Sequence, residues 1–88
     1  MRALLVEELL PEFDGCRLVN ELAPPAAGPD EVQVKIRAAA LGFPDLLMTH
    51  GGYQHKPELP FTPGTEMAGE ITALGENVTE FKIGDAVV

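Results

Sequence analysis

Apolar and polar residues alternate between Glu31 and Leu41, and this is the clearest pattern in the chain. A period of two places successive side chains on opposite faces of an extended segment, so that one face is buried while the other meets water. The pattern therefore predicts an antiparallel strand over residues 31–41 with one buried face. The apolar positions of that face are Val32, Val34, Ile36 and Ala38.

Further short apolar runs, bounded by turn-forming residues, predict more strands. Residues 2–7 and 16–22 enclose a turn-rich segment and predict a first hairpin. Residues 66–74 form another candidate, in which Gly69 predicts a bulge or a close approach of two backbones. Residues 83–88 begin a further strand. We expect about six short strands in all, with one helical turn.

The helical turn is expected after the alternating segment. Pro44 suits the first turn of a helix, where its missing N–H costs nothing. Asp45 would lie at the positive end of the helix dipole and is interpreted mainly as a helix-start residue. Gly51 and Gly52 are expected to end the helix.

Composition indicates a small β-rich unit. The chain has 88 residues, of which 45% are hydrophobic, with nine glycines and eight prolines. This hydrophobic content is typical of globular rather than disordered proteins. The proline-rich segments 23–30 and 56–63 are expected to be irregular loops.

The charge balance argues against polyanionic partners. Fourteen acidic and six basic residues give a net charge of −8. Phosphate backbones and anionic membranes are bound by clustered Lys and Arg, which this chain lacks, so we expect neither nucleic acid nor a membrane as a partner. The same scarcity argues against these residues alone gripping the phosphates of a nucleotide.

Cys16 is the only cysteine, so no disulfide can form within the chain. The amino-terminal apolar run is too short for a signal peptide, and no stretch approaches the roughly 20 apolar residues that cross a bilayer. We therefore expect a cytoplasmic protein.

Two common site types find little support. A dinucleotide fingerprint needs glycines two residues apart, and no pair in this chain has that spacing. A zinc site needs about four Cys, His or carboxylate ligands. His50 and His55 have a spacing that no common zinc motif uses, and two solvated loop histidines are the simpler interpretation. Cys16 is more typical of a small buried hydrophobe than of a ligand.

Three segments carry a family resemblance: residues 42–48 (GFPDLLM), 63–69 (PGTEMAG) and 78–85 (VTEFKIGD). They resemble the amino-terminal GroES-like domain of the medium-chain dehydrogenase/reductase family, in its zinc-independent quinone oxidoreductase branch. Zinc-dependent relatives have Cys and His where this chain has Gly42 and Thr65, so the resemblance implies that no metal is bound.

The resemblance implies a mainly β fold: a GroES-like, partly open β-barrel with one short helix, in which the barrel is expected to be truncated. Residues 1–88 would then be the amino-terminal part of a GroES-like catalytic domain, without the Rossmann nucleotide-binding domain. The parent enzyme would transfer hydride from NADPH to a quinone or an enone, such as an α,β-unsaturated carbonyl. The chain alone is expected to bind no NADPH and to be inactive.

The resemblance also assigns site residues. Tyr53 would pack against the nicotinamide and donate a hydrogen bond to the substrate oxygen, although an amphipathic ring at the barrel rim is the alternative. Gly42 and Thr65 would contact the cofactor, Gly42 through free backbone groups because the asparagine of many relatives is missing. The alternative for Thr65 is that its hydroxyl only satisfies the backbone of its turn. Phe43 and Leu47 would line an apolar substrate pocket with Tyr53; the alternative is that both are core residues.

Other expectations stay open at this point. Glu66 is expected to be buried near the site, as a carboxylate held by backbone N–H groups or a basic partner. A stand-alone GroES-like protein-interaction module without enzymatic activity is the alternative function, and a zinc alcohol dehydrogenase is a third. An unpaired edge at residues 83–88 is expected to promote self-association.

Overall fold

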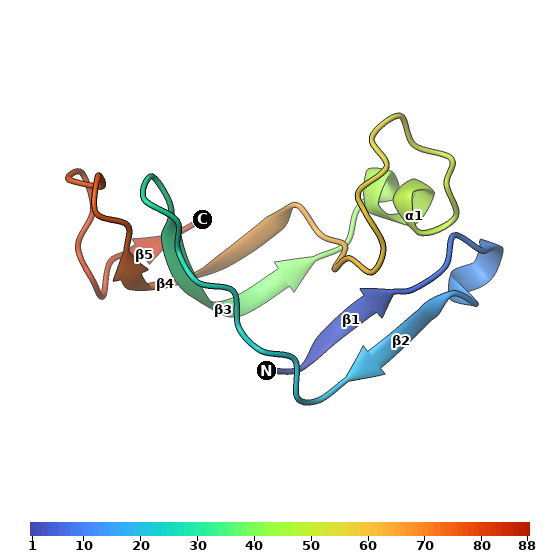
Figure 1. Cartoon of the computed structure of the whole chain (residues 1–88), viewed down its shortest axis with the longest axis horizontal. Coiled ribbons are helices and arrows are strands. Elements are labelled where there is room, and N and C mark those ends of the chain that lie inside the picture. Colours follow the sequence, from blue (N-terminus) through green and yellow to red (C-terminus); the bar gives the residue numbers. More distant parts are fainter. The chain divides into compact units, whose positions relative to one another are not determined.

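The computed structural model describes all residues, 1–88, and the chain divides into two compact units (Figure 1). The first combines Met1–Ala23 with Leu41–Thr65, and the second combines Pro24–Ala40 with Glu66–Val88. Each unit has its own sheet and is described by itself.

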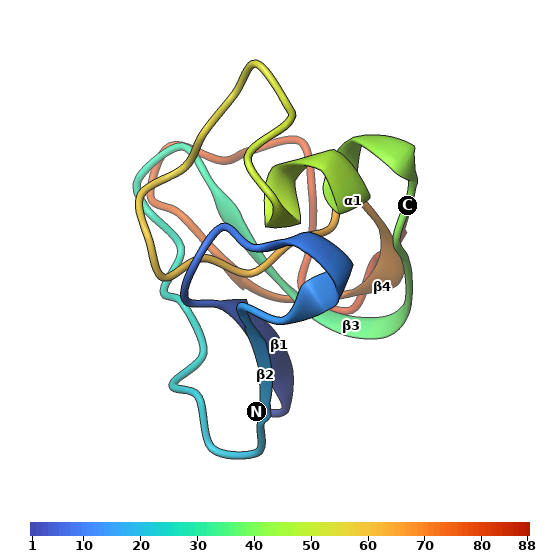
Figure 2. The same cartoon turned by 90° about the vertical axis from the view of Figure 1, so that its right-hand side faces the viewer.

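The first unit begins with the predicted hairpin. Strands β1 (Ala3–Val6) and β2 (Cys16–Val19) pair antiparallel, with Val6 opposite Cys16. Both strands are shorter than the apolar runs that predicted them. The connection contains a 3₁₀ helix (Pro11–Phe13), and Figures 1 and 2 show this loop beside the segment that carries the α-helix.

The helix α1 (Phe43–Thr49) starts and ends as its sequence predicts. Gly42 is the N-cap, Pro44 lies in the first turn, and Asp45 accepts a hydrogen bond from the Gly42 N–H at 2.8 Å. At the other end Gly51 has φ +80°. The N–H groups of Gly51 and Gly52 return to the carbonyls of Met48 and Leu47, at 3.4 and 2.9 Å. This is a Schellman motif, which satisfies helix-end carbonyls through a left-handed residue.

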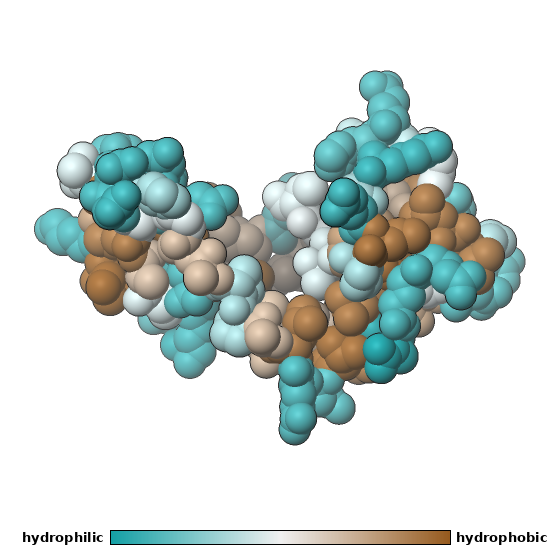
Figure 3. Space-filling model, viewed as in Figure 1, coloured by the Kyte–Doolittle hydropathy of each residue, from teal (hydrophilic) through white to brown (hydrophobic).

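The loop after α1 returns to the hairpin. Phe61 and Val6 exchange two backbone hydrogen bonds, at 2.8 and 3.1 Å, which join the proline-rich segment to β1. Val6 is fully buried and Met48 is nearly so. On the face that Figure 3 shows, apolar residues gather over the part of the first unit that carries β1, β2 and α1.

The second unit is a three-stranded antiparallel sheet in the order β3–β4–β5. Its strands are β3 (Val32–Ala40), β4 (Glu66–Leu74) and β5 (Ala86–Val87). Ile71 on β4 is its buried centre. The bulge predicted at Gly69 is confirmed, because the register shifts between Ile36, which faces Gly69, and Ala38. A Cβ on Gly69 would lie 2.2 Å from the Lys35 carbonyl oxygen.

Two details of the sheet prediction were wrong. The alternating segment forms β3, but its apolar residues do not share one buried face: Ile36 is 57% exposed and Ala38 is also exposed. Two register shifts interrupt the pairing with β4, so strict alternation does not carry one face through the strand. The structure has five strands rather than six, one in each of the five segments that predicted a strand. The segment at 56–63, expected to be irregular, adds only the isolated bridge of Phe61.

The predicted fold class is confirmed: the chain is mainly β with one short helix, and its strands form two open sheets. None of its helical segments is long and apolar enough to cross a membrane.

Candidate functional site

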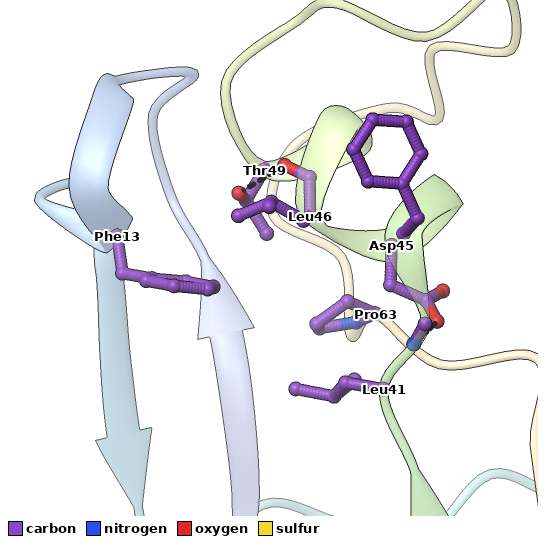
Figure 4. Close-up of a pocket in the computed structure, with 8 residues that line it drawn as sticks. Phe13, Leu41, Asp45, Leu46, Thr49 and Pro63 are labelled. Atoms are coloured by element: carbon purple, nitrogen blue, oxygen red, sulfur yellow. Dashed lines mark hydrogen bonds between the residues drawn. The ribbon is translucent and has the colours of Figure 1, made fainter.

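The first unit contains a cavity of about 390 Å³ between the 3₁₀ loop and α1 (Figure 4). Its wall is mostly apolar, and Figure 4 shows Phe13 across the space from Leu46, Pro63 and Leu41. The residues that line it are Phe13, Leu41, Gly42, Phe43, Asp45, Leu46, Thr49 and Pro63.

Asp45 is the only acidic residue in this wall, and it is 2% exposed. Its Oδ2 accepts the Gly42 N–H at 2.8 Å, and its Oδ1 accepts the Gly64 N–H at 3.1 Å. A buried carboxylate is costly unless it is hydrogen-bonded, and here both oxygens have a backbone donor. The prediction that Asp45 is a helix-start residue is confirmed, and it has a second, distant partner.

Thr49 is the other buried polar residue of the wall, at 1% exposure. Its hydroxyl donates to the Leu46 carbonyl at 2.7 Å, within the helix. No buried side-chain nitrogen or oxygen of the chain lacks a partner. The cavity therefore has few free polar groups and suits an uncharged, apolar group better than an ion.

Phe13 reaches the cavity from an unusual backbone conformation. Phe13 and the preceding Glu12 have φ values of 62° and 58°, in the left-handed region that bulky residues rarely adopt. Sequence reasoning missed Phe13, Leu41, Leu46 and Pro63 as lining residues. Leu41, Leu46 and Pro63 lie in or beside the motif segments, whereas Phe13 is distant from them in sequence and no motif signals that it meets them.

The residues predicted from resemblance are brought together only in part. Gly42 and Phe43 line the cavity, and Phe43 is 70% exposed. Leu47 lies on α1 but does not line the cavity, and Tyr53, in the following loop, does not line it either. Both are half-buried, whereas Thr65 is exposed and also lies outside the cavity wall. Their assigned roles stay predictions.

Two expectations about this region were wrong. The backbone of Gly42 is not free: its N–H is donated to Asp45, and its carbonyl accepts the Leu46 N–H at 3.2 Å. The helix start uses these groups itself. Glu66 is exposed rather than buried, because it lies at the first position of β4, opposite Ala40 at the end of β3.

Two ion pairs lie on the surface elsewhere. Arg17 donates to Glu7 from Nε at 2.9 Å, and Arg37 donates to Glu70 at 3.2 Å. The hydrogen bond from Arg17 holds the pKa of the Glu7 carboxyl below its ordinary value. Burial raises the pKa of the Cys16 thiol, as expected for a small hydrophobe on a strand.

No three His, Cys, Asp or Glu side chains gather in a group that could hold a metal ion. The candidate ligands named from sequence are dispersed. His50 and His55 are exposed loop residues, and Cys16 is half-buried on β2.

Comparison with known proteins identifies the family. A family model described as the alcohol dehydrogenase GroES-like domain matches residues 28–88. Quinone oxidoreductase-like protein 2 of Mus musculus is 43% identical over 70 residues, which cover 80% of this chain and 20% of that protein. The synaptic vesicle membrane protein VAT-1 homolog of Rattus norvegicus is 48% identical over 77 residues, covering 86% of this chain and 19% of that protein.

Solved structures agree with these matches. The quinone oxidoreductase of Escherichia coli, in complex with NADPH, superposes with a TM-score of 0.87 at 28% identity. The match covers 98% of this chain and 26% of that one, so the chain spans about a quarter of this relative's length. The chain belongs to the alcohol dehydrogenase GroES-like domain family, within the medium-chain dehydrogenases/reductases, and is similar there to quinone oxidoreductases.

Proposed function

We propose that residues 1–88 are the amino-terminal part of an NADPH-dependent, zinc-independent quinone or enone reductase. The observation that carries the proposal is the likeness, over 98% of this chain, to a quinone oxidoreductase whose structure contains NADPH. NADPH would supply the hydride. The nucleotide-binding part of the enzyme would lie outside residues 1–88.

The local chemistry fits the nicotinamide and substrate end of such a site better than the phosphate end. The cavity wall is apolar and its carboxylate is fully paired, which suits a neutral ring. Two of the six basic residues, Arg17 and Arg37, already pair with glutamates. The chain therefore offers an apolar wall that can contact uncharged groups, and few basic side chains that could bind phosphates.

Five predicted residues have roles in this proposal. Tyr53 donates a hydrogen bond to the oxygen of the substrate, where negative charge develops during reduction. Thr65, which is exposed, offers its hydroxyl to the cofactor. Phe43 and Leu47 provide apolar surface for the substrate, and Gly42 lets the cofactor approach because it has no side chain.

Zinc independence rests on the residues themselves. Gly42 and Thr65 have neither a thiol nor an imidazole, which are the zinc ligands that the resemblance places at these positions. A protein purified with stoichiometric zinc and active on alcohols would contradict this part of the proposal.

The test uses the protein encoded by the complete reading frame. NADPH oxidation is measured with 1,4-benzoquinone and with an enone. Tyr53→Phe should lower kcat by about 10²-fold, since that is the effect of losing one donor to a developing oxyanion. His55→Gln, an exposed change in the same loop, should have no effect. Wild-type protein without NADPH-dependent turnover would contradict the proposal and favour a protein-interaction module.

A further inference from the structure

The carboxylate of Asp45 joins two segments that are distant in sequence. One oxygen accepts from Gly42, three residues earlier, as in many helix starts. The other oxygen accepts from Gly64, 19 residues later. A helix-start role needs only the first of these bonds.

The second bond matters because little else holds the Gly64 segment. Phe61 is fixed by its bridge to Val6, and β4 begins at Glu66. Between them, over residues 62–65, the only hydrogen bond within the chain is the one from the Gly64 N–H to Asp45. This short segment therefore depends on one buried side chain for its position.

Burial strengthens the hydrogen bond between the Gly64 N–H and the Asp45 carboxylate. Asp45 is 2% exposed, so water does not compete for its oxygens as it does at the surface. Hydrogen bonds to a charged acceptor are about twice as strong as neutral ones. An amide in the same place would offer one acceptor oxygen and would turn an NH₂ group toward the other N–H, so only one of the two bonds could remain. The Gly42 bond is local and shorter, 2.8 Å against 3.1 Å, so the bond from Gly64 is the one that we expect to be lost.

We propose that Asp45 is a positioning residue that holds Gly64 and Thr65 at a fixed separation from Gly42. Gly42 and Thr65 are the two candidate cofactor contacts, so the carboxylate would set the spacing of the cofactor site without touching the reacting atoms. This inference rests on the proposed function for its role in catalysis. The joining of the two segments is tested independently of that function.

The chain offers a matched control. Asp85 also accepts a backbone N–H from three residues earlier, that of Lys82 at 2.9 Å, and it makes no second, distant hydrogen bond. Asp85→Asn thus repeats the local change of Asp45→Asn without the long-range one.

The first measurement is amide hydrogen exchange by NMR. In Asp45→Asn the Gly64 amide should exchange about tenfold faster or more, since one charge-assisted bond is lost. The Val6 amide, which bonds to Phe61, should keep its protection and report that the fold is intact. Asp85→Asn should leave Gly64 unchanged. Unchanged Gly64 exchange in folded Asp45→Asn would overturn the proposal.

A second measurement needs no variant, and it decides the question if Asp45→Asn does not fold. In a long-range HNCO spectrum of the wild-type protein, the amide nitrogens of Gly42 and Gly64 should both show a coupling across the hydrogen bond to the Asp45 carboxyl carbon. A Gly64 amide without this coupling, in a spectrum that shows it for Gly42, would overturn the proposal.

The third measurement is kinetic and uses the protein encoded by the complete reading frame. Asp45→Asn should raise the KM for NADPH about tenfold, with the KM for the quinone changed far less, because the misplaced contacts are those to the cofactor. Asp85→Asn should leave both unchanged. An equal rise in both KM values would overturn the positioning role. Wild-type protein without turnover would overturn the proposed function, while the exchange experiment would still decide whether Asp45 holds the segment.

Discussion

Asp45 and Glu66 are both carboxylates of the motif segments, yet their surroundings are opposite. Asp45 is buried and accepts two backbone N–H groups, whereas Glu66 is exposed at the first position of β4. The difference comes from the backbone. The start of α1 turns the Gly42 N–H toward Asp45 and the segment before β4 adds the Gly64 N–H, while a strand directs its N–H groups to the neighbouring strand. Residue type alone predicts a polar side chain, and local geometry decides whether it can be buried.

The pair of Arg17 and Glu7 gives a prediction at the residue scale. Arg17→Gln should raise the pKa of the Glu7 carboxyl toward its ordinary value of 4.5, because the hydrogen bond and the positive charge are lost. Since the folded-state pKa is lowered, the pair stabilises the fold above the unfolded-state pKa and ceases to do so as the pH falls through the folded-state pKa.

Carboxyl-carbon NMR measures this directly in the folded protein. The control is Arg37→Gln, which removes the partner of Glu70 and should leave the titration of Glu7 unchanged. A Glu7 titration that is identical in wild type and Arg17→Gln would contradict the prediction.

At the scale of elements, α1 illustrates what the sequence predicts well. Pro44 and Asp45 mark its first turn and Gly51 its end, and each signal acts within a few residues. The hairpin is equally local. The exposure of β3 was not predictable, because it depends on register shifts against β4, which lies more than 25 residues away in sequence. A period-two pattern predicts a strand but not which neighbours cover it.

The end of α1 provides a test with adjacent residues. Gly51→Ala should destabilise the protein by about 1 kcal/mol, because a Cβ is disfavoured at φ +80°. Gly52→Ala should change stability by less than about 0.5 kcal/mol, since its Cβ would meet Leu47 at 3.5 Å, an ordinary contact. Urea unfolding measures both, and equal effects would contradict the prediction.

The bulge in the second unit gives another test. A Cβ on Gly69 would lie 2.2 Å from the Lys35 carbonyl oxygen and 2.8 Å from Val34 Cγ1, so β3 and β4 would have to separate. Gly69→Ala should therefore cost about 1–3 kcal/mol in urea unfolding, as overpacking does. Gly52→Ala is again the control. A cost no greater than that of the control would show that the strands adjust freely.

At the scale of the whole molecule, the fold class and the family could be predicted and the cavity could not. Composition and short apolar runs indicate a small β-rich chain, and three motif segments carry the family resemblance. The cavity joins Phe13, α1 and Pro63, which meet only in the folded first unit. Its most distant member, Phe13, has a left-handed backbone that no local signal predicts.

Charge over the whole chain leads to a prediction about the cofactor. Residues 1–88 carry fourteen acidic and six basic residues, and two of the basic ones are paired with glutamates. No glycine pair has the spacing of a dinucleotide fingerprint. The negatively charged phosphates of NADPH would thus be repelled by the net negative charge of residues 1–88 and would find no cationic site there.

Titration of residues 1–88 with NADPH should give no saturable change in the fluorescence of NADPH. The quinone oxidoreductase of Escherichia coli, whose structure contains NADPH, serves as the positive control for the assay. Micromolar binding by residues 1–88 would contradict the prediction and would mean that this part of the chain recognises the cofactor through its apolar wall alone.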